Sequence, residues 1–249
     1  MTLDYFGIFA KYWEPGKVKT RLAASIGNEA ASDVYRAILN HLVTSLNSAA
    51  DRRAIAYTPA DKAKEFSVFP QWQQTPQSDG ALGARMANYF SETFAAGAGR
   101  VVLIGSDCPD VTPKVISEAY EALTHADVVL GPTFDGGYYL VGMAQKFHDI
   151  FSDITYSTES VLEETLSLAK RNGINCHSLD RLNDIDEIDD LNQYIQQLED
   201  RTSSNDASTM EAVLLEELTT ICRLGSETNR QSQSRNKEPS LKSPSSAVA

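Results

Sequence analysis

Apolar residues in this chain fall into two kinds of segment. Short unbroken runs, such as VVLIG at 101–105, predict strands that are covered on both faces, as in a parallel sheet. Longer segments, such as 28–46 with Val34, Ile38 and Leu42 on one stripe, predict helices that pack an apolar face on that sheet. Strands are expected at 5–10, 54–58, 68–74, 101–105, 127–131, 138–143 and 174–179. Helices are expected within 28–46, 80–94, 112–123, 157–173 and 187–199. This alternation predicts an α/β fold with a mostly parallel mixed sheet and helices on both faces, and ligands in such folds bind at the carboxyl ends of the strands.

The regular alternation ends near residue 199, which predicts three parts of the chain. Residues 1–200 would form one domain, and 201–225 would add an amphipathic helix in which Ser208 and Glu211 have the spacing of a capping box. That helix is expected either to pack back onto the domain or to present a surface to a partner. Residues 226–249 are rich in polar residues without periodicity, so a disordered tail is expected there.

Composition and charge exclude several classes of protein. The chain has 249 residues with 42% hydrophobic content, enough for one substantial domain. Its 34 acidic residues outnumber 22 basic ones, and the resulting net charge of −12 argues against a broad nucleic-acid interface. The three cysteines form no CxxC motif, which argues against a disulfide framework or a zinc site. No apolar run is long enough to span a membrane, so no membrane partner is expected. Together with the charge and the cysteines, this predicts a cytoplasmic protein without nucleic-acid partners. Its oligomeric state is left open.

Basic residues gather in one loop of this acidic chain. The segment EPGKVKTRL places Lys17, Lys19 and Arg21 between a predicted strand and a predicted helix, where cations and free N–H groups can meet phosphate oxygens. It is not a Walker A loop, because the earlier glycine of that motif is absent and Lys17 is followed by Val18. The alternative, which we weigh equally with phosphate binding, is that this segment is only a solvent-exposed loop.

Aspartates follow two of the predicted strands. Asp107 ends a buried strand and would point into the crevice, where a carboxylate suits Mg²⁺ or Mn²⁺. Asp110 is expected instead to cap or turn the chain before the next helix. Asp135, in the segment DGGYY, has the signature of a hairpin turn, and at most one of Tyr138 and Tyr139 is expected to face the crevice.

Two further motifs are ambiguous when taken alone. The acidic segment NDIDEIDDL at 183–191 is either part of a site or only a helix N-terminus, where negative charge is favourable. The segment LGARM places Arg85 beside two glycines.

The order of these motifs along the chain carries a resemblance. The series FAKYWEPGKVKTRL, GALGARM, GSDCPD, GPTFDGGYYLVGM, ITYSTESVLEETL and NDIDEIDDL, within residues 3–198, resembles the bacterial glycosyltransferase-like family known as selenodomain-associated or arsenosugar-biosynthesis transferases. That family belongs to the GT-A nucleotide-diphospho-sugar transferase superfamily and is similar to nucleotidyltransferases that act on the molybdenum cofactor and on phospholactate. The resemblance implies a Rossmann-like GT-A domain that binds a nucleotide diphosphate through Mg²⁺ or Mn²⁺.

The resemblance also implies roles for individual residues. Asp107 matches the metal-binding aspartate, and Asp184 or Asp186 matches a second metal contact, of which we select Asp186. The Thr-Pro usual after that motif is replaced here by Glu187 and Ile188. The residues expected to bind the nucleotide are Lys11, Lys17, Lys19, Arg21, Arg85, Gly136 and Gly137.

Three functions follow from this pattern. The first is glycosyl transfer from a nucleotide-diphosphate sugar to a small-molecule acceptor. Lys17, Lys19 and Arg21 would then share the charge of the leaving diphosphate, and Asp135 would contact the sugar or the acceptor hydroxyl, or act as a base. The second is nucleotidyl transfer from a nucleoside triphosphate to a phosphorylated small molecule, with release of pyrophosphate. The third is a nucleotide-binding protein without catalysis.

Overall fold

The computed structural model describes residues 2–235, with side chains as far as Gly225. The strands are β1 Asp4–Lys11, β2 Arg52–Thr58, β3 Gln73–Pro76, β4 Arg100–Ile104, β5 Val128–Pro132, β6 Tyr138–Ala144 and β7 Cys176–Ser178. The helices are α1 Thr20–Ile26, α2 Asn28–Ser45, α3 Ala63–Phe66, α4 Leu82–Ala95, α5 Pro113–Ala122, α6 Val161–Arg171, α7 Ile188–Ser203 and α8 Thr209–Arg235. A short 3-10 helix at Ala60–Lys62 precedes α3.

The strands form one mixed sheet in the order β3-β2-β1-β4-β6-β5-β7. Strand β6 is antiparallel to both of its neighbours, and the other pairs are parallel. From the adjacent strands β1 and β4 the chain leaves toward opposite edges of the sheet, which is the kind of switch point where open α/β sheets bind ligands. The predicted α/β class with a mostly parallel mixed sheet is confirmed.

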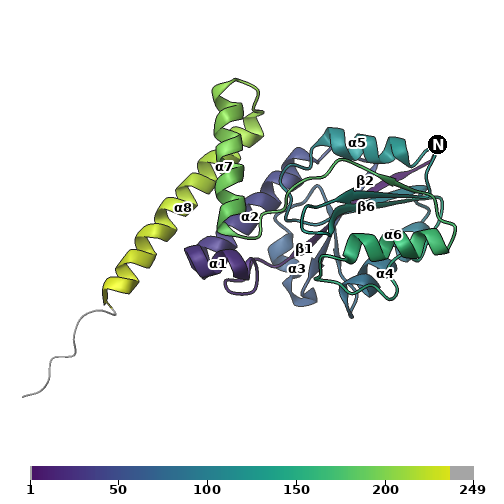
Figure 1. The fold of residues 1–249 in the computed structure, drawn as a ribbon, viewed down its shortest axis with the longest axis horizontal. Coiled ribbons are helices and arrows are strands. Elements are labelled where there is room, and N and C mark those ends of the chain that lie inside the picture. The colour runs from purple at the N-terminus through teal and green to yellow at the C-terminus, as the bar shows by residue number, and fades with distance from the viewer. Residues whose placement is uncertain (1, 236–249) are drawn as a thin grey trace, which may run out of the picture.

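Two apolar layers cover the sheet. Successive residues of a strand point to opposite faces, so Phe6 and Ile8 of β1 join the layer under α2 and α5, while Tyr5 and Phe9 pack on the other side. Helices α4 and α6 cover that second face (Figure 1). The central strands are therefore buried on both sides, as their unbroken apolar sequences predict.

Three local predictions need correction. No helix was expected at 20–26, where α1 is only seven residues long and follows the basic loop directly. The weak strand expected at 68–74 is displaced to Gln73–Pro76, because Phe69 and Trp72 are buried anchors in turns rather than strand residues. The last strand, β7, spans three residues within the expected six.

The last two helices pack beside the domain. Leu214 and Leu218 of α8 are buried in the same apolar layer as α2, and α8 also contacts α1 and α7 (Figure 1). Of the two uses we considered for this segment, the structure shows packing onto the domain. The helix begins at a capping box, because Ser208 and Glu211 exchange hydrogen bonds with each other's backbone N–H groups.

The helix α8 runs further than the sequence pattern indicated. It continues to Arg235, so the first part of the expected disordered tail is helical. Residues 226–235 contain no proline or glycine that would end a helix. The rest of that expected tail, 236–249, lies outside the described residues. None of the helices within 2–235 has both the length and the apolar character of a membrane-spanning segment.

Candidate active site

A cleft of about 1010 Å³ opens where the parallel strands end. The ends of β1 and β4 and the segments that follow them form one part of its wall. Because β6 runs antiparallel, its first residues and the hairpin before it lie at the same edge of the sheet. The topology therefore brings the basic loop, Asp107 and Asp135 to one cleft, although they are far apart in sequence.

One apolar side chain anchors the basic loop to the domain. Val18 is buried in the core, between the exposed Lys17 and the inward-pointing Lys19. Lys19 has the left-handed backbone angles φ 46° and ψ 47° and directly precedes α1. A left-handed conformation costs a non-glycine residue roughly 1–2 kcal/mol, and such strain is common at functional sites. Its presence here indicates that the surrounding contacts fix the direction of the Lys19 side chain.

Lys19 joins the two predicted metal ligands. Its ammonium forms ion pairs with Asp107 and with Asp186, the latter at 3.1 Å from Oδ1. The lysine side chain is 3% exposed, whereas the two carboxylates are 47% and 43% exposed and face the cleft. Burial of Lys19 opposes its charge, but the two carboxylates outweigh that effect and raise its pKa above the ordinary value. Lys19 is therefore a permanent cation in the wall of the cleft.

A single backbone bond places the late acidic motif beside Asp107. The N–H of Ile185 donates to the carbonyl oxygen of Asp107 at 3.0 Å, and the Ile185 side chain is buried. Asp186 follows at once, and its N–H donates to the Asp190 carboxylate in the first turn of α7. The motif begins a helix through the Glu187–Asp190 capping box, and it also places Asp186 at the cleft, so the role of Asp186 as a metal contact stays a prediction.

Asp184 adds a further acidic group beside this corner, although it does not itself line the cleft. Burial, reinforced by the charges of Asp135 and Asp186, raises its pKa to about 6. Arg21 offers only a distant counter-charge, since its NH1 atom lies 3.9 Å from Asp186 and its side chain is 71% exposed. Carboxylates thus outnumber cations in this part of the cleft.

Positive charge predominates elsewhere in the same cleft. Lys11, Lys17 and Arg85 line it, and none of them has a carboxylate within 4 Å among the described residues. Lys11 donates instead to the carbonyl oxygen of Lys17 at 2.8 Å, and Arg85 donates to Gly80 and to the Gln77 side chain. Three cations without counter-ions favour an anionic ligand.

The hairpin between β5 and β6 holds Asp135 in a defined orientation. Its carboxylate accepts hydrogen bonds from the Thr133 hydroxyl and from the Gly137 N–H, the latter at 3.0 Å. Asp135 and Gly137 also line the cleft. The interpretation of this segment as a hairpin turn is therefore compatible with the interpretation of Asp135 as a site residue. Gly136 does not line it. Its φ of +90° and its contact with the backbone of Glu159 make it a structural glycine.

The tyrosines after the hairpin differ from the prediction. Both Tyr138 and Tyr139 line the cleft, although their side chains belong to opposite faces of the sheet. The cleft lies at the end of the sheet rather than over one face, so it receives side chains from both. A register shift at Gly131 and Pro132 adds to the irregularity there.

Asp110 lies in a turn, as one of the two expected alternatives had it, but it does not cap the next helix. The helix α5 is capped by Thr112, whose hydroxyl accepts from the Val115 N–H. Asp110 instead accepts hydrogen bonds at 3.2 Å from both terminal nitrogens of Arg201, which lies on α7. The sequence therefore predicted only a local role for Asp110, whereas its side-chain partner lies 91 residues away.

Two residues at the cleft, Tyr35 and Ser106, were missed by sequence reasoning. Tyr35 of α2 reaches the cleft, where its hydroxyl contacts the backbone N–H of Lys11 and the Ser106 hydroxyl, both at 2.8 Å. The sequence offers only faint signals for them: a hydroxyl on the buried face of an amphipathic helix, and a serine directly before the strand-end aspartate.

The donor set agrees with a divalent cation held in part by the ligand. Asp107 and Asp186 provide hard carboxylate oxygens that face the cleft. Within 2–235, no group of three or more His, Cys, Asp or Glu side chains is arranged to hold a metal by itself. Mg²⁺ is typically bound by one or two carboxylates together with substrate phosphates, so two protein ligands suffice for that kind of site.

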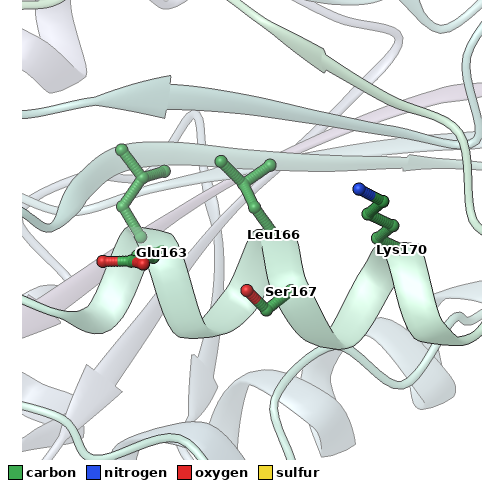
Figure 2. Close-up of a pocket in the computed structure, with 5 residues that line it drawn as sticks. Glu163, Leu166, Ser167 and Lys170 are labelled. Carbon is green, nitrogen blue, oxygen red and sulfur yellow. The ribbon is translucent and has the colours of Figure 1, made fainter.

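A second hollow, of about 280 Å³, is not a comparable site. Its lining residues all belong to α6, and Figure 2 shows Glu163, Leu166, Ser167 and Lys170 along that one helix. No residue of the predicted site lies there. The chemistry of the molecule is concentrated in the larger cleft.

Comparisons with known proteins agree with this geometry. The model of a family described as "Uncharacterized protein conserved in bacteria (DUF2064)" matches residues 42–158, which include Asp107 and the hairpin. A crystal structure from Desulfovibrio desulfuricans G20, provisionally assigned as a nucleotide-diphospho-sugar transferase, is 34% identical, with a TM-score of 0.80. The match covers 90% of this chain and 99% of that one. The chain belongs to the same family as this relative, that of the nucleotide-diphospho-sugar transferases.

More distant structures share the fold of this protein. A nucleotidyl transferase from Methanothermobacter thermautotroptrophicus is 16% identical, with a TM-score of 0.51, over 78% of this chain and 96% of that one. A cytidylyltransferase from Leptospira borgpetersenii serovar Hardjo-bovis (strain JB197) is 14% identical, with a TM-score of 0.51, over 91% of this chain and 96% of that one. A comparison with curated proteins finds no match.

Proposed function

We propose that this protein transfers a glycosyl group from a nucleotide-diphosphate sugar to a small-molecule acceptor. The observation that carries the proposal is the buried Lys19 ammonium between Asp107 and Asp186, in the wall of a cleft that also contains unpaired Lys11 and Lys17. The provisional assignment of the Desulfovibrio relative as a nucleotide-diphospho-sugar transferase supports it. The narrower relationship to the selenodomain-associated or arsenosugar-biosynthesis transferases is part of the proposal and rests on the order of the motifs.

The separation of charges in the cleft suits a diphosphate leaving group. Lys11, Lys17 and Arg85 would face its oxygens, and Lys17 and Arg21 would share the negative charge that grows as the glycosyl bond breaks. Groups that are already in place for developing charge need no reorganisation during the reaction. Asp107 and Asp186 would hold Mg²⁺ or Mn²⁺, which when bound neutralises part of the diphosphate charge.

Asp135 would act on the other side of the reacting bond. Its carboxylate is oriented by Thr133 and Gly137 and lines the cleft beside Tyr138. We assign it contact with the donor sugar or the acceptor hydroxyl, from which it would take the proton. The chemistry belongs to residues 1–200, and the accessory helix α8 is assigned a supporting role.

The test must separate glycosyl from nucleotidyl transfer, because the same charges serve both. The full-length protein is incubated with nucleotide-diphosphate sugars or with nucleoside triphosphates, each with and without Mg²⁺ or Mn²⁺. Release of free nucleoside diphosphate from a nucleotide sugar supports the proposal. Release of pyrophosphate from a triphosphate in the presence of a phosphorylated small molecule would replace it with nucleotidyl transfer.

Two variants make this test specific to the site. Asp107→Ala should abolish metal-dependent release and the thermal stabilisation that the donor produces. Asp33→Asn removes a charge from an exposed residue of α2 that does not line the cleft, and it should behave as the wild type. Unchanged turnover in Asp107→Ala, or no stabilisation of the wild type by any nucleotide, would overturn the proposal.

A further inference from the structure

The hydroxyl of Tyr35 links the ends of two neighbouring strands. The ring comes from α2 and is 3% exposed. Its oxygen accepts from the backbone N–H of Lys11, at the end of β1, and lies 2.8 Å from Oγ of Ser106, just after β4. Burial and the nearby charge of Asp107 raise the pKa of Tyr35, so the phenol keeps its proton.

The direction of the bond between Tyr35 and Ser106 can be worked out. A backbone N–H can only donate, so Lys11 occupies the accepting side of the phenol oxygen. If Ser106 also donated, the phenolic hydrogen of this 3% exposed residue would be left without an acceptor among the described residues, which is the expensive arrangement for a polar group. Tyr35 therefore donates to Ser106.

The hydrogen of the Ser106 hydroxyl is then free for another acceptor. Ser106 is 4% exposed, and its hydroxyl has no other hydrogen-bond partner within the described part of the chain. The residue lines the cleft directly beside Asp107. A donor that is held by Tyr35 and belongs to a cleft-lining residue is suited to an oxygen of the ligand.

We infer that Ser106 binds the nucleotide by donating a hydrogen bond to one of its oxygens. The inference rests on the proposed function, because it requires a nucleotide in the cleft. A ribose hydroxyl and a phosphate oxygen are both acceptors with the required chemistry. The relay from the Lys11 N–H through Tyr35 fixes the orientation of the serine before the ligand arrives.

Binding of nucleoside diphosphates to the full-length protein tests this directly. With Mg²⁺ present, the diphosphate that gives the largest thermal shift is titrated calorimetrically into the wild type and into Ser106→Ala. Loss of one such hydrogen bond should weaken binding about tenfold, or about 1.4 kcal/mol. Tyr35→Phe keeps the serine donor and should lose distinctly less affinity than Ser106→Ala.

Ligand analogues identify the acceptor. If it is a ribose hydroxyl, the 2′,3′-dideoxy nucleotide binds the wild type more weakly, and Ser106→Ala causes no further loss with that analogue. If it is a phosphate oxygen, Ser106→Ala weakens inorganic pyrophosphate as much as the nucleotide. Either pattern supports the inference.

Stability measurements separate this role from a purely structural one. Urea unfolding is measured for each variant, and Ser106→Cys, a much weaker donor of similar size, takes the place of Ser106→Ala if the latter does not fold. A folded serine variant with wild-type affinity for all probes would overturn the inference, as would equal losses in Tyr35→Phe and Ser106→Ala. If the wild type binds neither nucleotide nor pyrophosphate, the proposed function fails as well.

Discussion

Oδ1 of Asp186 lies 3.1 Å from Nζ of Lys19, although 167 positions separate the two residues. The ion pair joins the loop after the first strand to the segment before α7. Asp107, from the middle of the chain, completes the arrangement. The site therefore forms only when the whole domain folds, and a change at Lys19 should affect stability and ligand binding together.

Lys19→Met is expected to lower both properties. The buried side chain keeps its volume but leaves Asp107 and Asp186 without their shared cation. Breaking a fully buried pair costs about 3–5 kcal/mol, and because these carboxylates are nearly half exposed we expect about 1–3 kcal/mol. Urea unfolding measures the stability, and titration with a nucleoside diphosphate should show at least tenfold weaker binding.

Lys17→Met is the matched control for this change. Lys17 is exposed and has no carboxylate partner within the described residues, so its loss should change the unfolding free energy by no more than about 0.5 kcal/mol. Its effect should appear only in nucleotide binding. Equal stability losses in the two variants would show that the ion pairs of Lys19 do not stabilise the fold.

Gly136→Ala should disrupt the hairpin that carries Asp135. Gly136 has φ +90°, and a Cβ atom there would overlap the carbonyl oxygen of Glu159. Gly27, with φ +88° and nothing within 4 Å, provides a control with the same backbone strain but no clash. We expect Gly27→Ala to cost roughly 1 kcal/mol and Gly136→Ala clearly more, as measured by urea unfolding. Equal costs would mean that the loop at 157–160 moves aside freely.

Much of the fold could be predicted because local patterns decide it. The central strands have unbroken apolar sequences, and Thr112–Pro113 at the start of α5 shows both a cap and a first-turn proline. The basic loop, Asp107 and Asp135 could be selected for the same reason, since each follows a predicted strand. Their common location then follows from a sheet in which parallel strands end at one edge.

Partners distant in sequence could not be predicted. Asp110 was predicted to have only a local role, in a cap or a turn, because nothing near it in sequence indicates Arg201. The hydrogen bond between the hydroxyls of Tyr35 and Ser106 depends on how α2 packs over the sheet. The sequence of neither segment indicates that packing. The length of α8 was underestimated because polar residues without periodicity are compatible both with a disordered tail and with a helix.

Arg201 is expected to hold α7 and α8 against the loop that follows Asp107. It pairs with Asp110 at 3.2 Å and with Glu211 at 3.4 Å, and its side chain is 34% exposed. Arg201→Met should lower the unfolding free energy by about 1–2 kcal/mol, after allowance for this exposure. Lys114→Met, which removes a pair of an 85% exposed lysine with Glu118, should change it by less than about 0.5 kcal/mol. Similar results for both variants would show that the Arg201 pairs are no stronger than a surface ion pair.

The contribution of Glu211 should depend on pH in a defined direction. Partial burial opposes its charge, but hydrogen bonds from Ser208 and the charges of Arg201 and His41 outweigh this and lower its pKa below the ordinary 4.5. A carboxyl group whose pKa is lower in the folded state stabilises the protein above its unfolded pKa, and that stability is lost as the pH falls through the folded value. Glu211→Gln should therefore be less stable than the wild type at pH 7, and the difference should shrink as the pH falls below 4.5. Urea unfolding of both proteins at pH 7, 5 and about 3.5 measures this difference, with Glu216→Gln, for which no ion pair is found in the described residues, as the control. A difference that stays constant across this range would show that Glu211 acts through packing rather than through its charge.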